Sequence, residues 1–176
     1  MTTTTETGVT TQVYRVYIKA TPQAVWDAIT DPAWTERYGY GGRAEYEPDV
    51  RPGATYRGLT SPDMRAVGAP EVGVDGEVLE ADPPHRLVQT WRMLMDEDMT
   101  AQGFTRLTYE IEAGQADVTK LTLIHELEGA PKLALLMSGG MEDMGAGGGW
   151  SWILSDLKSL LETGASLGPL SGPDRS

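Results

Sequence analysis

The chain has 176 residues, and its 14 Lys and Arg against 26 Asp and Glu give a formal net charge of −12 at pH 7. This length is enough for one domain with a sizeable core. Because the charge is negative, phosphate backbones and anionic membrane surfaces repel the chain. There is no cysteine, which excludes disulfides, thiolate zinc sites and cysteine nucleophiles. We therefore expect a cytoplasmic protein with no nucleic-acid partner; a homodimer is left open.

The two ends of the chain differ from its body. Residues 1–11 are polar and Thr-rich, and 165–176 are rich in Gly, Pro and Ser, so both are expected to be flexible. The first segment lacks the basic start and apolar centre of a secretory signal. No stretch approaches the ~20 apolar residues of a membrane helix, so no membrane insertion is expected. Residues 12–164 show no linker or repeat, which predicts one domain.

The first predicted elements are a strand and two short helices. Residues 13–19 alternate in the manner of a half-buried strand. Thr21–Pro22 and Asp31–Pro32 are helix-start signals, because Thr and Asp cap a helix and Pro suits its first turn. The second helix is expected to run to about Tyr38.

Strand patterns dominate the middle of the chain. Residues 60–72 interrupt them and are expected to form a long loop, a candidate lid. The turn-forming runs 82–85 and 114–117 join strands as hairpins. Strands are expected at 44–47, 54–59, 76–81, 86–95, 103–113 and 118–126.

The last predicted element is a long amphipathic helix beginning near Gly149 and ending at Gly164. The preceding stretch, 138–149, is too rich in glycine for a rigid helix. The apolar stripe of the long helix consists of Trp150, Ile153, Leu154, Leu157, Leu160 and Leu161. The opposite side is expected to carry Ser151, Asp156, Lys158, Ser159 and Glu162.

This order of elements predicts an α+β fold. Short hairpins make the sheet antiparallel, with about six to seven strands curved around the C-terminal helix. A sheet wrapped around one helix leaves a hollow where a small molecule can bind.

Several segments resemble one protein family in the same order along the chain. Residues 20–32, with the sequence ATPQAVWDAITDP, are similar to the opening of the heat-shock-protein-90 ATPase activator-like family. The hairpin over 76–91, the strands beginning at Thr105 and Thr119, and Gly149–Trp150 before the Leu-rich helix continue the resemblance. It covers about 12–164 and places the chain in the START-related (SRPBCC) superfamily with the birch-pollen-allergen fold.

The resemblance implies a helix-grip fold with an apolar cavity between sheet and helix. Members of the family mostly bind small hydrophobic molecules, so a lipid-like or aromatic ligand is the expected partner. Relatives in the superfamily include cyclases and hydrolases, which makes an enzyme the first alternative. A protein-interaction or co-chaperone-like module is the second.

Residues on the faces expected to line the hollow form the candidate binding set. Gln89, Tyr109 and His125 would be polar groups in an apolar wall, which typically orient a ligand. For His125 the structural interpretation, a hydrogen-bonded core or rim histidine, is favoured over a ligand-orienting role. The full candidate set is Trp34, Tyr38, Tyr56, Gln89, Trp91, Tyr109, Leu121, His125, Trp150 and Leu154.

Other chemistries have less support. Asp96–Asp98 is more typical of a solvated turn than of a metal site, and the glycines of 138–149 do not form a phosphate loop. For an enzyme, the acid–base group could be His125, Tyr109 or an acid such as Glu110 or Glu126. Alternation places both glutamates on the face opposite Tyr109 and His125, which weakens this alternative. We therefore expect no cofactor, no metal and no assigned catalytic residue.

Overall fold

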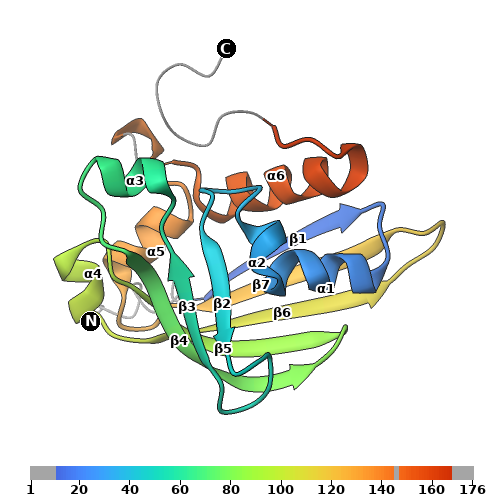
Figure 1. Cartoon of the computed structure of the whole chain (residues 1–176), viewed down its shortest axis with the longest axis horizontal. Coiled ribbons are helices and arrows are strands. Elements are labelled where there is room, and N and C mark those ends of the chain that lie inside the picture. Colours follow the sequence, from blue (N-terminus) through green and yellow to red (C-terminus); the bar gives the residue numbers. More distant parts are fainter. Residues whose placement is uncertain (1–10, 145–146, 168–176) are drawn as a thin grey trace, which may run out of the picture.

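Within residues 11–144 and 147–167, which the computed structural model describes, seven antiparallel strands form a single sheet in the order β1-β7-β6-β5-β4-β3-β2 (Figure 1). This confirms the α+β fold with an antiparallel sheet and a long C-terminal helix. The strands are β1 (Thr11–Ile18), β2 (Arg43–Glu47), β3 (Thr55–Leu59), β4 (Val72–Asp82), β5 (Arg86–Met93), β6 (Thr105–Ala113) and β7 (Thr119–Glu126).

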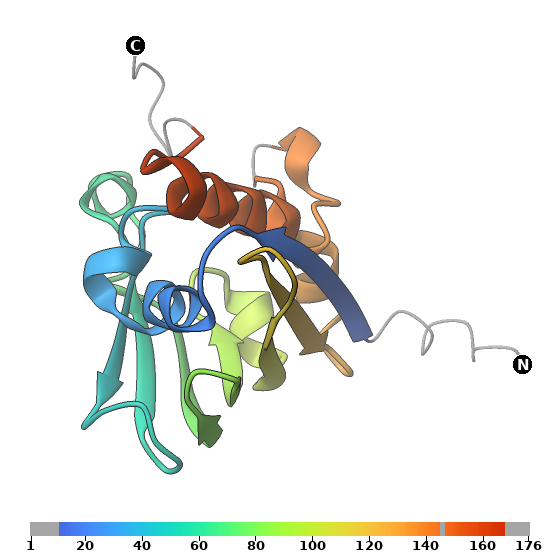
Figure 2. The same ribbon diagram turned by 90° about the vertical axis from the view of Figure 1, so that its right-hand side faces the viewer.

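The helices lie mainly on one side of this sheet. Figure 2 shows the strands as an arc beneath α6, with α1 and α2 beside it. Helix α1 contacts β6, β7 and α6, whereas α6 contacts β1 and α5. No helix of the described ranges has the length and apolar character required to cross a membrane. The helical segments are α1 (Pro22–Thr30), α2 (Pro32–Thr35), α3 (Pro62–Ala66), α4 (Glu97–Ala101), α5 (Pro131–Met137), the 3₁₀ turn η2 (Glu142–Met144) and α6 (Gly149–Thr163).

The expected capping signals form local hydrogen bonds. The Thr21 hydroxyl accepts a bond from the N–H of Ala24 at 3.1 Å, and the Asp31 carboxylate accepts one from the N–H of Ala33 at 2.9 Å. Gly164 ends α6 with φ +84°, in the left-handed region that favours glycine.

The sheet and α6 enclose the core. Leu157 and Leu154 of α6 are buried, and Leu161 is half-buried against the same cluster. The Lys158 ammonium donates to the Tyr17 carbonyl at 2.6 Å and to the Glu162 carboxylate at 2.7 Å. The polar side of α6 is therefore tied to strand β1 at its margin.

Two short helices were not predicted. Residues 60–72 contain α3, whose first turn is capped by the Ser61 hydroxyl accepting from the N–H of Met64 at 3.2 Å. Asp96 caps α4 in the same way through the N–H of Met99 at 3.1 Å. Both sequences carry the cap signal, but the helices are too short to show an apolar periodicity.

The polar side of α6 was also partly misassigned. Asp156 is fully buried because its carboxylate accepts backbone N–H bonds from Gly39 at 2.9 Å and Leu167 at 2.6 Å. The expected second helix ends at Thr35 rather than near Tyr38. The segments expected to be flexible, 1–11 and 165–176, lie largely outside the described residues, although Thr11 begins β1.

Replacing Leu157 by Ala should lower the free energy of unfolding by roughly 2–5 kcal/mol, because a buried leucine is lost and a cavity is left. Urea unfolding measures this change. The matched control is Ser155→Ala on the exposed side of α6, which should change stability by no more than about 0.5 kcal/mol. Equal stability of the two variants would mean that the sheet does not grip this helix.

Candidate functional site

A cavity of about 270 Å³ lies between α6 and one half of the sheet. Most of its sheet wall comes from β3, β4, β5 and the start of β2. One residue each comes from β6, α1 and α2, and α3, α5 and α6 supply further residues of the wall. Residues of β1 and β7 do not contribute to the wall within the described chain. The reason is packing: α1 covers β6 and β7, so the hollow is left over the other strands.

The wall is mainly aromatic and sulfur-containing. Its aromatic rings belong to Tyr38, Tyr40, Tyr56, Trp91, Tyr109 and Trp150. Its methionines are Met64, Met93, Met95 and Met137. Aromatic rings supply flat apolar contact area with polar tips, and methionine adapts to irregular shapes.

Half of the candidate binding set lines this cavity. These residues are Tyr38, Tyr56, Trp91, Tyr109 and Trp150.

The other candidates lie outside the wall. Leu121 of β7 and Leu154 of α6 are buried in the hydrophobic core cluster. Gln89 is buried and accepts a hydrogen bond from the Tyr46 hydroxyl at 2.9 Å. Trp34 is half-buried, with the Arg37 guanidinium 4.8 Å from its ring centroid.

His125 connects the helix to the sheet. The Trp150 indole N–H donates to His125 Nδ1 at 3.0 Å, and His125 Nε2 lies 2.8 Å from the Thr105 hydroxyl. Because an indole can only donate, Nδ1 is unprotonated and the ring proton is on Nε2. The Thr105 hydroxyl donates onward to the Trp91 carbonyl at 2.8 Å. Both ring nitrogens are thus bonded to protein groups.

Burial lowers the pKa of His125 to about 3. The charged ring would lose hydration and would also oppose the Trp150 donor. The imidazole is therefore neutral at physiological pH, and it does not line the cavity. This geometry fits the structural interpretation of His125.

Arg43 is the one charged side chain in the described wall. Its guanidinium lies 2.8 Å from the Glu36 carboxylate and 3.9 Å from that of Glu45. These two carboxylates offset its charge at the cavity margin. The acids considered for catalysis, Glu110 and Glu126, form ion pairs with arginines of neighbouring strands, at 2.6 Å and 3.5 Å.

Gly149, the last residue of the glycine-rich segment, lines the cavity. Gly149 has φ +69°, and a Cβ there would collide with the Met137 carbonyl. A Cβ at Gly147 would collide with the Tyr40 hydroxyl, which accepts a bond from the N–H of Gly149 at 3.2 Å. The glycines thus let α5, Tyr40 and the start of α6 approach closely. Glycines directly before Trp150 were the sequence signal for this contact.

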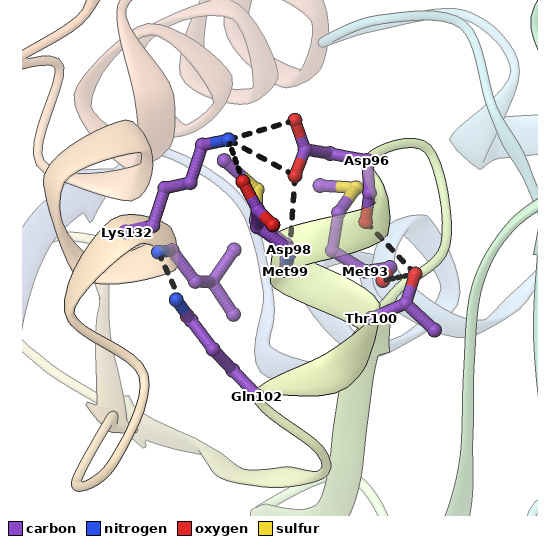
Figure 3. Close-up of polar contacts among 8 residues, drawn as sticks. Met93, Asp96, Asp98, Met99, Thr100, Gln102 and Lys132 are labelled. Atoms are coloured by element: carbon purple, nitrogen blue, oxygen red, sulfur yellow. Dashed lines mark hydrogen bonds and ion pairs between the residues drawn. The ribbon is translucent and has the colours of Figure 1, made fainter.

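The acidic run after β5 fixes α5 against α4. Lys132 of α5 contacts Asp96 at 3.1 Å and Asp98 at 3.0 Å (Figure 3). The Thr100 hydroxyl donates to the Met93 carbonyl at 2.9 Å, which ties α4 to the end of β5. Since Met137 of α5 and Met93 both line the cavity, these contacts position part of its wall.

The sequence analysis did not identify several residues of the cavity wall. Val74, Leu136 and Ile153 are ordinary apolar residues, and nothing in their sequence pattern separates a wall position from a core position. Gly58 lies in a strand and has no positive φ, so its backbone conformation does not require glycine. Its missing side chain instead leaves room for the Tyr56 hydroxyl, which would be 3.3 Å from a Cβ at this position. An isolated strand glycine is a known sign of such close approach.

Comparison with known proteins gives the family. Residues 19–162 match the family described as Activator of Hsp90 ATPase homolog 1-like protein. The chain belongs to this family. No curated protein matches the sequence.

Solved structures show the same fold at low sequence identity. An HSP90 activator from Plasmodium falciparum is 22% identical, with a TM-score of 0.51 over 67% of this chain and 73% of that chain. The Aha1 dimer from Colwellia psychrerythraea is 18% identical, with a TM-score of 0.58 over 88% and 97%. CalU16 from Micromonospora echinospora is 19% identical, with a TM-score of 0.51 over 77% and 73%. The resemblance to the activator-like family and its SRPBCC fold is confirmed.

The low pKa of His125 predicts a pH dependence of stability. In the unfolded chain the ring has its ordinary pKa of about 6.5, whereas in the fold the pKa is about 3. Between these values the unfolded state binds the proton and the folded state does not. The stabilisation is therefore complete above about pH 6.5 and is lost as the pH falls toward 3.

Urea unfolding of the native protein and of His125→Gln at about pH 7 and about pH 5 tests this prediction. Glutamine can keep one acceptor and one donor, so the variant can fold without the titrating ring. The native protein should lose about 2 kcal/mol more than the variant over this interval. His85→Gln, at the exposed histidine, should behave like the native protein. If the free energy of unfolding changed equally with pH in the native protein and in His125→Gln, the pH dependence would not come from His125.

Proposed function

We propose that this protein binds a small hydrophobic molecule, aromatic or lipid-like, in the cavity beneath α6. The observation that carries the proposal is an aromatic and methionine-lined space of about 270 Å³ inside a folded domain. Typical ligand sites measure ~300–1,000 Å³, so this one suits a small ligand with two or three fused rings.

The charge of the wall supports an uncharged ligand. Arg43 is already paired with Glu36 and Glu45, and the chain as a whole is strongly acidic. A carboxylate or phosphate group would therefore find no free counter-charge in the described wall. An apolar ligand is stabilised by leaving water and does not require a counter-charge.

The alternatives have less support. A cyclase- or hydrolase-type reaction requires a wall group that exchanges protons near neutral pH, but burial raises the pKa of the wall residues Tyr38 and Tyr109. Burial lowers the pKa of His125, which does not line the cavity. A co-chaperone role rests on the family description and on one similar structure. The cytoplasmic location, the homodimer and the single-domain organisation stay predictions.

Equilibrium dialysis against fluorene, a flat hydrocarbon of three fused rings, tests the proposal. The native protein should retain fluorene, and Val74→Trp should lose most of it because the larger ring fills the cavity from β4. The matched control is Val13→Trp, which places the same ring at an exposed position of β1. Near-UV circular dichroism confirms that each variant is folded. Equal retention by Val74→Trp and Val13→Trp would locate the binding elsewhere and reject the cavity.

A further inference from the structure

The hydroxyl groups that line the cavity differ in whether their protons are already used. The Tyr38 hydroxyl donates to the Ala28 carbonyl at 2.8 Å. The Thr60 hydroxyl donates to the Pro70 carbonyl at 2.6 Å, and the Thr35 hydroxyl is directed to a carbonyl of its own helix at 3.4 Å. These protons are committed to the backbone, so these groups have little to offer a ligand.

Tyr109 is different. Within the described chain its hydroxyl has no hydrogen-bond partner, although its ring lines the cavity. No fully buried side-chain oxygen of the described residues lacks a partner. The Tyr109 oxygen is therefore not sealed off, and the cavity is the space from which it can be reached.

Tyr56 brings a second hydroxyl to the same region. Among the described residues no group accepts a hydrogen bond from the Tyr56 hydroxyl, so its proton is free. The Tyr56 and Tyr109 side chains line the same cavity. Gly58 faces the Tyr56 oxygen, where a Cβ would stand only 3.3 Å away; the missing side chain leaves this oxygen uncovered.

Both phenols are uncharged donors at physiological pH. Burial raises the pKa of Tyr56 to about 12 and that of Tyr109 well above its ordinary value. A free donor inside an apolar wall requires an acceptor, because an unpaired polar group loses its hydration without compensation. The Tyr40 hydroxyl accepts a hydrogen bond from the N–H of Gly149 at 3.2 Å, so its oxygen is already engaged at the start of α6 although its proton has no acceptor among the described residues.

We propose that the ligand is a neutral, flat molecule carrying a carbonyl oxygen, which accepts a hydrogen bond from Tyr109 with Tyr56 as the second donor. This inference rests on the proposed function and narrows it from hydrophobic molecules in general to aromatic ketones and similar compounds. A carboxylate is disfavoured because Arg43 is already paired.

The test compares 9-fluorenone with fluorene, which have the same ring system and differ in a carbonyl against a methylene group. In equilibrium dialysis the native protein should bind fluorenone about 3- to 10-fold more tightly, the effect of one net hydrogen bond. Tyr109→Phe should remove this preference while fluorene binding is retained. The matched control is Tyr46→Phe, because Tyr46 is outside the wall and its hydroxyl is bonded to Gln89; its preference should equal that of the native protein.

The infrared carbonyl stretch of bound fluorenone gives an independent measurement. Hydrogen bonding should lower its frequency in the native complex relative to the Tyr109→Phe complex, which a purely structural role of Tyr109 would not do. Equal binding of fluorenone and fluorene by the native protein, with no shift, would overturn the ligand class but leave the cavity proposal intact. Failure to bind either compound would overturn the proposed function itself.

Discussion

The hydrogen-bonded chain through His125 joins helix α6 to three neighbouring strands of the sheet. It runs from Trp150 on α6, through His125 on β7 and Thr105 on β6, to the backbone of Trp91 on β5. Its two ends are the tryptophans of the cavity wall, whose ring centroids are 6.1 Å apart. A histidine is suited to this position because its neutral ring accepts at one nitrogen and donates at the other. An apolar side chain here would leave the buried Trp150 indole N–H without an acceptor and would remove the N–H that the Thr105 hydroxyl accepts.

A second set of contacts fixes the other side of α6. The buried Asp156 carboxylate binds the backbone of Gly39, in the loop between α2 and β2 that forms part of the wall. Asp156 is about one and two-thirds turns beyond Trp150, so α6 is held at two points on different sides. The helix can then span a hollow without collapsing into it, because its position depends on directed bonds as well as on packing.

The sequence predicted the fold better than it predicted the site. Thr21–Pro22, the hairpin turns and the apolar stripe of α6 are local signals, and each forms the expected element. The cavity depends instead on which half of the sheet the helices cover. Leu121 and Tyr109 lie on inward faces of neighbouring strands, yet Leu121 is packed in the core and Tyr109 reaches the open space. That difference comes from the position of α1, which the sequence pattern of β6 and β7 does not predict.

Asp156 and His125 show a second limit of sequence patterns. Both are polar residues that hydropathy places on a surface or at a ligand, and both are fully buried. What makes burial tolerable is a set of partners from distant segments: Gly39 and Leu167 for the carboxylate, Thr105 and Trp150 for the imidazole. A buried polar group is stable only when such partners are present. By the same reasoning, the Tyr109 and Tyr56 hydroxyls are informative exceptions in the wall, since the described residues supply them with no acceptor.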